Sequence, residues 1–381
     1  MRSNEGDPLR IGITCYPAIG GSGILASALG EELARRGHEV HFVSHDRPFR
    51  LPPGTPNTFF HEVPLGEQGP FRYSDYTLPL AVRLAEVTRA HRLDLLHAHY
   101  AVPHATAAVL AAQMLPPAER PKVVTTLHGT DTTLLARQPG YAPAIRHALI
   151  ASDGVTAVSE FLRQDTQRVL NLDCPIEMIH NFFEPRPPTR PRAEVRAELG
   201  LNGERLVVHL SNLRPVKRIE LLLETFARLG PPEKVRLLIL AGEDFRPYEP
   251  VVRRLGLENR VLVRENVVAV EDYLQAADLG LFTSASESFC LSILEAMAVR
   301  CPSVSTRVGG IPEVSEDGLT GVLVPSTDPE VIAREAQRLL DDEPRRTRMG
   351  DAGYVRAREV FSAGQIVPRY ERFYRQVCAR A

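Results

Sequence analysis

Seven residues separate Glu287 from Glu295 in a string that follows a buried apolar run at 279–283. The pattern predicts a helix that starts near Phe289, with Glu287 in the preceding loop and Glu295 about two turns into the helix. Both carboxylates could then face one ligand, because carboxylates accept hydrogen bonds from vicinal sugar hydroxyls and the N–H groups at a helix start bind phosphate. A helix with one glutamate near its N-terminus and one in solvent is the alternative, which the string alone favours.

Two further strings combine the end of a predicted strand with groups that suit phosphate. Arg214 and Lys217 lie in Ser211-Asn-Leu-Arg-Pro-Val-Lys217, between a strand and the next helix, a placement that suits a diphosphate. The paired glycines of Thr306-Arg-Val-Gly-Gly-Ile-Pro-Glu313 precede a helix and would let a phosphate approach the backbone. Two solvated cations and a structural turn remain the alternatives.

A glycine-rich string, Gly20-Gly-Ser-Gly23, lies between the first predicted strand and the first predicted helix. Gly21-x-Gly23-x-x-Ala26 matches the dinucleotide-binding fingerprint, and Asp46 follows about 20 residues later. Taken alone, the match predicts a nicotinamide or flavin enzyme, and a tight turn without a ligand is the alternative. A dehydrogenase would leave the glutamate pair unexplained.

Histidines gather in two strings at predicted strand ends, which begin at His97 and Thr125. His97 and His99 would share one face of a strand, a spacing that metals use, but no carboxylate completes a ligand set and we predict no metal. His128 is interpreted as a hydrogen-bond donor to a ligand or to backbone, with a satisfied core histidine as the alternative. The chain has no Asp-x-Asp pair, so Arg, Lys and helix N-termini would have to meet the charge of a diphosphate.

The elements that must position these residues alternate between short apolar runs and amphipathic stretches, which is typical of βαβ units and parallel sheets. Strands are predicted near 10–16, 39–44, 59–63, 94–98, 122–127, 154–158 and 176–179, and then near 206–210, 235–240, 260–263, 279–283, 303–305 and 321–324. Four prolines in Glu184–Pro191 mark a domain boundary between the two series. The sequence therefore predicts an α/β protein of two doubly wound, Rossmann-like domains.

Composition excludes several classes of protein. The 45 basic and 47 acidic side chains give a net charge of −2, which does not suit a nucleic-acid binder. No apolar run approaches the ~20 residues that span a bilayer, and the polar N-terminus lacks the apolar region of a signal peptide. The five cysteines are scattered without a Cys-x-x-Cys pair, which indicates neither a disulfide framework nor a zinc site. We expect a cytoplasmic protein without a membrane span.

In this order, the strings resemble the retaining glycosyltransferases of family four, whose GT-B fold has two Rossmann-like domains facing a central cleft. The Glu287–Glu295 pair is similar to that family's Glu-x7-Glu signature, and the resemblance covers essentially the whole chain. The longer strings resemble a branch of the family that transfers N-acetylglucosamine from its UDP donor to L-malate, the first step of bacillithiol biosynthesis. These strings are Thr14-Cys-Tyr-Pro-Ala-Ile-Gly-Gly-Ser-Gly23, His97-Ala-His-Tyr-Ala-Val-Pro-His104, Thr125-Thr-Leu-His-Gly-Thr-Asp131, Val158-Ser159 and His180-Asn-Phe182.

The resemblance implies an acceptor domain over 1–184, a UDP-sugar donor domain over 185–360 and a C-terminal helix, about 361–381, that packs back on the acceptor domain. The donor-binding residues that it implies are Gly21, Ser22, Asn212, Arg214, Lys217, Glu287, Phe289, Cys290, Leu291 and Glu295. Catalytic roles are assigned to His128, Glu287, Lys217 and Arg214, and acceptor binding is assigned to Ser22, Tyr100, Thr126 and Arg146.

Individual roles follow from the same resemblance. Glu295 would hold the ribose of UDP, Glu287 would orient the sugar, and Lys217 would bind the diphosphate. The family's partner arginine falls at Asn212 in this chain, so Arg214 is taken as its substitute. Cys290 departs from the family as well, because that position usually reads Gly; so does Arg300, which also stands at a common Gly position.

The implied reaction is a front-face displacement, since no enzymic nucleophile can be placed for a double displacement. UDP would depart while the malate hydroxyl attacks from the same side, with cationic side chains and no metal or cofactor easing the step. Alternatives remain: a glycosyltransferase of the same fold with an inositol phosphate, lipid or sugar acceptor, a sugar-nucleotide epimerase, or a non-catalytic binding module. A homodimer also stays open.

Overall fold

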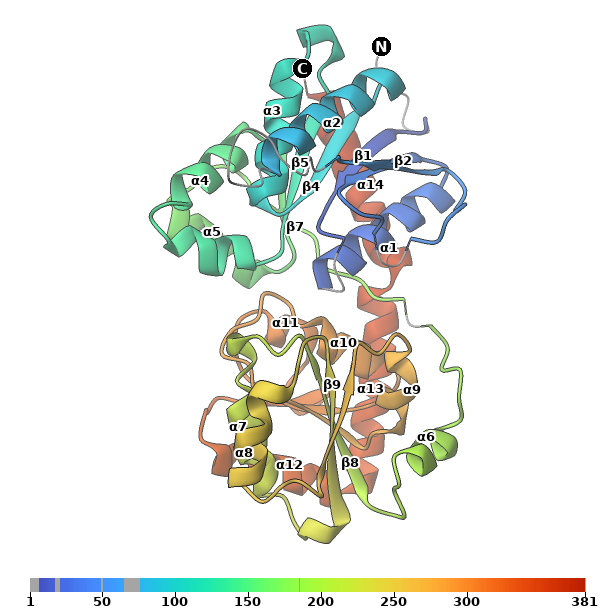
Figure 1. The fold of residues 1–381 in the computed structure, drawn as a ribbon, viewed down its shortest axis with the longest axis vertical. Coiled ribbons are helices and arrows are strands. Elements are labelled where there is room, and N and C mark those ends of the chain that lie inside the picture. The colour runs from blue at the N-terminus through green and yellow to red at the C-terminus, as the bar shows by residue number, and fades with distance from the viewer. Residues whose placement is uncertain (1–6, 18–20, 49–50, 65–75, 185, 381) are drawn as a thin grey trace. The chain divides into compact units, whose positions relative to one another are not determined.

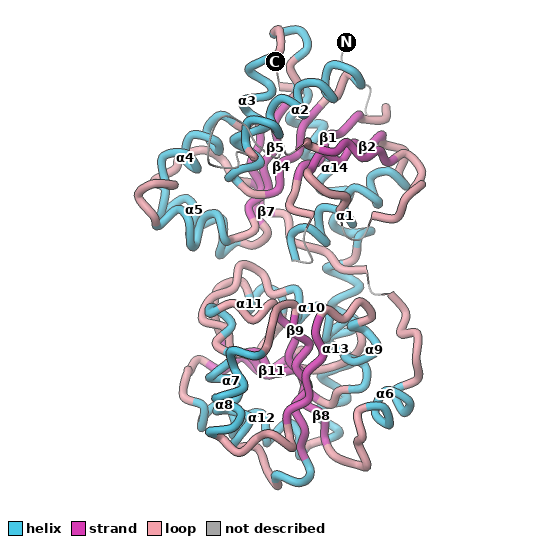
Figure 2. The backbone as a smooth tube through the Cα atoms, in the orientation of Figure 1, coloured by secondary structure: helices cyan, strands magenta, loops and turns pink. Residues whose placement is uncertain are grey.

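The computed structural model describes residues 7–17, 21–48, 51–64, 76–184 and 186–380. The chain divides into two units, Met1–Phe182 with Ala363–Ala381, and Phe183–Ser362. Each unit carries its own sheet of parallel strands with helices around it (Figure 2). The predicted boundary between 184 and 185 falls within two residues of this division, at a point where position 185 lies outside the described residues.

The first unit is built on a seven-stranded sheet with the order β3-β2-β1-β4-β5-β6-β7. Figure 1 labels β1, β2, β4, β5 and β7 of this sheet and the helices around it. Its strands are β1 (Arg10–Thr14), β2 (Glu39–Ser44), β3 (Thr58–Glu62), β4 (Leu95–His99), β5 (Lys122–Leu127), β6 (Gly154–Ala157) and β7 (Glu177–Met178). Its α-helices are α1 (Gly21–Arg35), α2 (Thr77–His91), α3 (Thr106–Met114), α4 (Ala142–Ala151), α5 (Glu160–Leu170) and α14 (Ala363–Ala379). The strand order reverses between β1 and β4, the point where doubly wound sheets bind ligands.

The second unit repeats this plan with six strands in the order β10-β9-β8-β11-β12-β13. Its strands are β8 (Arg205–Ser211), β9 (Val235–Ala241), β10 (Val261–Glu265), β11 (Leu279–Phe282), β12 (Ser303–Thr306) and β13 (Gly321–Val324). Its α-helices are α6 (Arg192–Glu198), α7 (Ile219–Ala227), α8 (Glu249–Arg254), α9 (Val270–Ala276), α10 (Leu291–Ala298), α11 (Ile311–Val314), α12 (Pro329–Asp341) and α13 (Glu343–Phe361). The reversal now falls between β8 and β11.

The C-terminal helix α14 belongs to the core of the first unit, although 180 residues of the second unit (183–362) precede it. Its buried face packs in one cluster with the apolar side chains of β1 and α1. The residues on this face are Ile366, Val367, Tyr370, Phe373, Tyr374 and Val377. Helix α14 therefore buries its apolar face in the core of the first unit.

Helix α10 begins at Leu291, which leaves Glu287 in the preceding loop, as predicted, and places Glu295 in the second turn of the helix. Two other elements differ from the prediction. Helix α1 begins at Gly21, so Gly21 and Gly23 lie in its first turn and not in a segment between strand and helix. The 19-residue helix α13 was missed because its polar, arginine-rich sequence shows little apolar periodicity, yet Met349 and Phe361 are buried.

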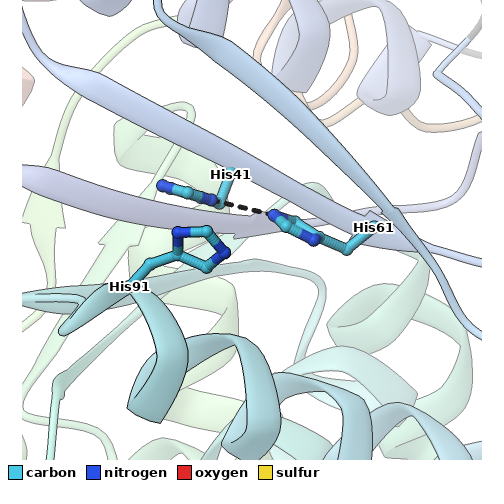
Figure 3. Close-up of side chains that lie close together, drawn as sticks. All are labelled: His41, His61 and His91. Atoms are coloured by element: carbon cyan, nitrogen blue, oxygen red, sulfur yellow. Dashed lines mark hydrogen bonds between the residues drawn. The ribbon is translucent and has the colours of Figure 1, made fainter.

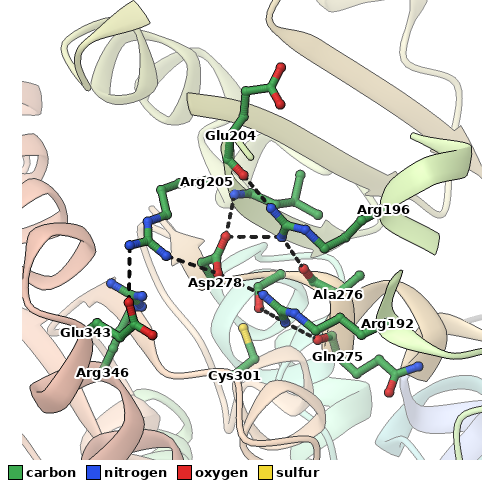
Figure 4. A network of polar contacts seen from close by, with 12 residues as sticks. Arg192, Arg196, Glu204, Arg205, Gln275, Ala276, Asp278, Cys301, Glu343 and Arg346 are labelled. Atoms are coloured by element: carbon green, nitrogen blue, oxygen red, sulfur yellow. Dashed lines mark hydrogen bonds and ion pairs between the residues drawn. The ribbon is translucent and has the colours of Figure 1, made fainter. Parts of the chain in front are cut away.

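The part of the chain that follows the proline-rich segment, beginning with helix α6, is held in place by a network of arginines around Asp278 (Figure 4). Arg192 of α6 lies 2.8 Å from the Asp278 carboxylate, and Arg196 lies 3.2 Å from it. The same carboxylate accepts a hydrogen bond from the Leu206 N–H at 2.8 Å. Because Asp278 is nearly buried and bonded on both oxygens, it ties α6 to the start of β8 and β11.

Candidate active site

Lys217 and Glu287 form an ion pair at the point where the second sheet reverses its order. Lys217 ends the short 3-10 turn Pro215–Lys217 after β8, and Glu287 lies in the loop after β11. The Lys217 Nζ lies 2.6 Å from Glu287 Oε1, and the two side chains are only 17% and 10% exposed. The Ser284 hydroxyl donates a hydrogen bond to the same carboxylate oxygen at 2.7 Å. A buried, oriented cation therefore stands where an open α/β sheet binds its ligand.

The electrostatics of this pair keep Lys217 charged. Burial works to lower the pKa of Lys217, but the Glu287 carboxylate outweighs it, and the pKa is raised above its usual value. A charged lysine held by one carboxylate keeps two N–H donors for an anion. The pair can therefore bind a diphosphate without a change of protonation.

The backbone of Glu287 is held by the paired glycines that the sequence analysis singled out. The Gly310 N–H donates to the Glu287 carbonyl at 2.8 Å. Gly309 has a φ of +56°, and a Cβ there would lie 2.0 Å from the same carbonyl oxygen. The paired glycines therefore form a structural turn, which was the alternative to a phosphate-binding role. Only glycine at this position lets the turn pack against the Glu287 loop.

Cys290 begins the helix that carries Glu295. Its φ of 78° lies in the left-handed region that favours glycine, which explains why this position is usually Gly in the family that the sequence resembles. Phe289 anchors the turn, since its ring is buried and packs edge-to-face on Phe361 at 5.6 Å. The first N–H groups of α10, from Leu291 onward, thus follow Glu287 by only four residues, and Glu295 lies half-buried in the same helix.

Arg214 and Asn212 differ from Lys217 in their surroundings. The Arg214 side chain is 54% exposed and lies 3.8 Å from Glu243. Asn212 is half-buried, and within the part of the chain that the structure describes its Oδ1 has no hydrogen-bond partner. The structure thus places Arg214 beside the Lys217 turn as a surface cation, whereas Asn212 presents an unused acceptor.

In the first unit, His128 follows β5 and meets His99 at the end of β4. The two rings stack with centroids 5.1 Å apart, and His99 Nδ1 and His128 Nε2 share a hydrogen bond of 2.8 Å. Burial lowers the pKa of His128 to about 3 and the pKa of His99 well below its usual range. Both rings are therefore neutral at pH 7, and each offers one donor and one acceptor.

Tyr100 and Asp131 fix the loops that follow these strands. Tyr100 has a φ of 84°, a strained value for a non-glycine residue, and its ring lies 5.2 Å from His128. The buried Asp131 carboxylate accepts from the Gly129 N–H at 3.0 Å and from the Ala101 N–H at 3.1 Å. Burial raises the pKa of Asp131 to about 6 despite these hydrogen bonds. Asp131 stands in a string that we quoted for its resemblance, and no pattern around it predicted this bridging role.

The remaining predicted residues of this unit are not all brought together. His97 is a satisfied core histidine, since its nitrogens bond Thr126 Oγ1 at 2.7 Å and Tyr374 OH at 2.8 Å. Thr126 also bonds Thr156 at 2.7 Å, so its hydroxyl serves this internal network. Arg146 lies on an exposed face of α4. Gly21 and Ser22 stand at the start of α1, where backbone N–H groups lack helical partners.

Buried polar atoms without partners mark a place that sequence reasoning missed. Within the described residues, both ring nitrogens of His104, the Tyr76 hydroxyl and His45 Nδ1 are buried and make no hydrogen bond. The Tyr16 ring packs on His104 at 4.5 Å, and Tyr76 lies 6.1 Å from it. Unmet buried donors and acceptors are costly unless a ligand or water satisfies them. His104 belongs to a quoted string, but Tyr76 and His45 carry no sequence signal.

A small cavity lies beside the stacked histidines, entirely within the first unit. It is lined by Leu25, Leu29, His99, His128, His180, Asn181, Phe182 and Tyr370. Helices α1 and α14 thus close one side of the His99–His128 pair.

Family comparisons agree with two glycosyltransferase halves. Residues 19–186 match the family described as Glycosyltransferase Family 4, and residues 191–356 match Glycosyl transferases group 1. The chain therefore belongs to family four of the GT-B glycosyltransferases, and it is an enzyme of the hexosyltransferase type.

Individual relatives narrow the comparison. The chain is 41% identical over 372 residues to N-acetyl-alpha-D-glucosaminyl L-malate synthase of Bacillus anthracis, covering 97% of both chains. It is 30% identical over 362 residues to D-inositol 3-phosphate glycosyltransferase of Xylanimonas cellulosilytica, covering 87% of this chain and 85% of the relative.

Solved structures share the fold at low identity. Sucrose-phosphate synthase from Thermosynechococcus elongatus superposes with a TM-score of 0.79 at 23% identity, covering 98% of this chain and all of the other. Anabaena HepE, in complex with UDP and glucose, superposes with a TM-score of 0.76 at 20% identity, covering 96% of this chain and 99% of the other. No helix among the described residues is long and apolar enough to cross a membrane.

Proposed function

We propose that this enzyme transfers N-acetylglucosamine from UDP-N-acetylglucosamine to the hydroxyl of L-malate with retention of the anomeric configuration, the first step of bacillithiol biosynthesis. The observation that carries the proposal is the 41% identity to an N-acetyl-alpha-D-glucosaminyl L-malate synthase along 97% of both chains. The Lys217–Glu287 pair at the reversal of the second sheet supports the proposal. A cation suits the diphosphate of a sugar nucleotide, and a carboxylate beside it can accept hydrogen bonds from the sugar hydroxyls.

The second unit holds the donor in this proposal. Glu295 accepts the ribose hydroxyls, and Glu287 with the backbone of Phe289 and Leu291 orients the sugar. Lys217 and the first N–H groups of α10 bind the diphosphate, and Arg214 and Asn212 flank it. Gly21 and Ser22 contribute N–H donors from the start of α1 in the first unit.

Transfer is a front-face displacement in this proposal. The bond between the anomeric carbon and the β-phosphate oxygen breaks, and a bond from the malate hydroxyl oxygen forms on the same face. The hydroxyl proton passes to the departing phosphate oxygen, so UDP and the malate glycoside are the only products. Lys217 stabilises the charge that develops on the diphosphate, which is the largest catalytic contribution we assign to a side chain. We assign no metal or other cofactor to this step.

The first unit binds the acceptor, with Ser22, Tyr100, Thr126 and Arg146 as the proposed contacts and His128 against the transferred sugar. The unmet atoms of His104, Tyr76 and His45 extend this set, because a dianion needs hydrogen-bond donors in a buried pocket. Replacing Arg146 by Ala tests the weakest member. We expect the KM for malate to rise strongly while the KM for the UDP-sugar stays nearly constant, and equal changes in both would remove Arg146 from the acceptor site.

Location and assembly complete the proposal. We propose a cytoplasmic enzyme, because all five cysteines are free thiols in the structure and reducing compartments keep them so. A homodimer stays open as a further possibility for the assembly.

Product analysis tests the proposed function. Purified enzyme is incubated with UDP-N-acetylglucosamine alone, with L-malate and with D-inositol 3-phosphate, and products are identified by mass spectrometry. The account predicts a malate glycoside and UDP only in the malate reaction. A product with inositol phosphate alone would support the second candidate function, which the 30% identical relative favours. Conversion of the donor without any acceptor would indicate an epimerase.

A further inference from the structure

Three histidines converge at the edge of the first sheet, outside the candidate active site (Figure 3). His41 is buried on β2, His61 lies on the edge strand β3, and His91 is the last residue of α2. One ring nitrogen from each can be chosen so that all three lie within 4.8 Å of one another. Their spacing of 20 and 30 residues matches no short motif, so the sequence analysis did not single them out.

The fold explains why they meet. In the parallel register of β2 and β3, His41 pairs with Phe59, and His61 lies two residues further along the same strand. Side chains two residues apart share a face of a strand, so His41 and His61 point to the same side of the sheet. Helix α2 covers that side and ends there, with the His91 ring centroid 4.3 Å from His41 and 5.1 Å from His61.

A carboxylate already fixes the protonation of the central ring. His41 Nε2 lies 2.7 Å from Glu39 Oε1, so this nitrogen carries the proton and donates it. In the neutral ring the other nitrogen, Nδ1, then presents its lone pair, and His61 Nε2 donates to it at 2.9 Å. His91 meets the other two rings only through ring contacts in the described structure. A carboxylate on the far nitrogen of a histidine is the usual support of a histidine ligand to a metal.

We propose that His41, His61 and His91 form a site for a divalent transition-metal ion of the zinc type, with Glu39 as the positioning residue of His41. Tetrahedral zinc holds its nitrogen ligands about 2.0–2.1 Å away and therefore about 3.3 Å from one another. The 2.9 Å His41–His61 contact and the 4.8 Å limit of the cluster lie on either side of that spacing. Side-chain rotation of the half-exposed His91 closes the difference, and water takes the fourth position.

Binding needs no net loss of protons. His61 moves its proton from Nε2 to Nδ1, and the freed Nε2 lone pair joins Nδ1 of His41 on the ion. The His41 and His61 rings are in the neutral form that metals require, since burial lowers the pKa of His41, and burial and the neighbouring histidines lower the pKa of His61 to about 4. The nearby Arg83 guanidinium opposes a cation, but it is paired with Glu86 at 3.0 Å.

The consequence is structural. The ion would tie the edge strand β3 to β2 and to the end of α2, in addition to the sheet, the ring contacts, the Arg83 hydrogen bond to the Glu62 carbonyl and the apolar core that α2 shares with β2. None of the residues that we assign to the donor or the acceptor belongs to this cluster. The proposed ion is therefore a clamp on the first unit and takes no part in the sugar transfer, so the inference stands apart from the proposed function.

Cobalt provides a direct test, because tetrahedral Co²⁺ has intense visible absorption bands. The full chain, freed of any affinity tag and stripped with chelator, is titrated with Co²⁺ and then with Zn²⁺. We expect one equivalent of tetrahedral Co²⁺ per chain, displacement by one equivalent of Zn²⁺, and a rise in Tm on metal addition. The variants His61→Gln and His91→Gln should lose the cobalt spectrum and the rise in Tm.

Controls separate the cluster from adventitious binding. His147→Gln removes an exposed histidine on α4 and should bind Co²⁺ as the parent does. Glu39→Gln should keep the spectrum and weaken affinity by about 10-fold or more. The proposal is overturned if His61→Gln and His91→Gln, with Tm values near that of the metal-free parent, retain the parent's cobalt binding, or if the parent shows no tetrahedral spectrum. If these variants unfold, Glu39→Gln decides, since unchanged affinity there contradicts the geometry.

Discussion

The candidate sites of the two units use charge in opposite ways. The second unit buries an ion pair, Lys217 with Glu287, and raises the pKa of the lysine. The first unit buries neutral rings, His99 and His128, whose pKa values burial lowers far below the usual range. Lys217 and Glu287 follow β8 and β11, between which the second sheet reverses its order, and the histidine pair lies at the ends of β4 and β5, next to the reversal of the first sheet. The fold therefore determines where a ligand can bind. The side chains that follow each strand determine whether the ligand contacts a charged group or a neutral one.

The largest effect that would sharpen this contrast is acidification. The pKa values of His97, His104 and His128 are lowered to about 3 in the folded chain, so below pH 6.5 the unfolded chain binds protons that the folded chain does not. The contribution of each neutral histidine to the free energy of unfolding is fully present above pH 6.5. It falls as the pH drops, by on the order of 2 kcal/mol per histidine at pH 5. In the described part of the second unit, His209, at about 4, is the one histidine with a lowered pKa.

Hydrogen exchange can measure this difference unit by unit. Between pH 7 and pH 5, after correction for intrinsic exchange, protection should fall far more in β4 and β5 than in β8 and β11. Asp131 acts in the opposite direction, because its pKa is raised to about 6 and its protonation favours the folded state below that pH. One such group offsets only part of the loss. Equal losses in both units would contradict the contrast.

Removal of the buried cation should cost most of the activity. Lys217→Met should lower kcat by about 10³-fold, or roughly 4 kcal/mol, because nothing replaces the charge beside the diphosphate. UDP release is the assay. Lys234→Met is the matched control, since Lys234 also ends a 3-10 turn that begins with Pro but is exposed. A Lys217→Met enzyme with nearly parental kcat would show that the ion pair has no catalytic role.

The glycine contact on Glu287 can be isolated with a pair of substitutions. Gly309→Ala and Gly318→Ala both force alanine to a positive φ, but a Cβ at Gly318 meets no atom within 4 Å and one at Gly309 lies 2.0 Å from the Glu287 carbonyl oxygen. Gly318→Ala should cost about 1 kcal/mol of stability, and Gly309→Ala about 2 kcal/mol more together with a loss of kcat. Urea unfolding and steady-state kinetics measure both; similar values for the two would mean that the loop yields.

The smallest effect belongs to Arg214. Its side chain is 54% exposed and near Glu243, so solvent screens its charge at the diphosphate. Arg214→Ala should lower kcat/KM for the UDP-sugar by less than about 10-fold, or 1.4 kcal/mol. A loss that equals that of Lys217→Met would make Arg214 the true substitute for the family arginine that falls at Asn212.

Local sequence patterns were enough to predict much of the fold and part of the candidate site. Buried strands such as β8 are near-continuous apolar runs, and Gly37 ends helix α1 with a φ of 94°, so both could be predicted. Helix α13 could not, because its arginines hide a narrow buried stripe. Lys217 and Glu287 were found through their strings, but their direct contact joins residues 70 positions apart and needed the sheet.

Residues whose roles depend on tertiary contacts could not be predicted from the sequence. Asp131 bridges two loops through backbone N–H groups, which no spacing announces. The His41, His61 and His91 cluster arises from strand register and the end of a helix. The acceptor roles of Thr126 and Arg146 stay predictions; the structure adds that the Thr126 hydroxyl also serves an internal network and that Arg146 lies on an exposed helix face.

A structure of the enzyme with bound UDP tests the central claim most directly. The account predicts the diphosphate against Lys217 and the start of α10, with the ribose hydroxyls on Glu295 and no UDP contact to the neutral His99–His128 pair. UDP bound in the first unit against these histidines, away from Lys217 and Glu295, would contradict it.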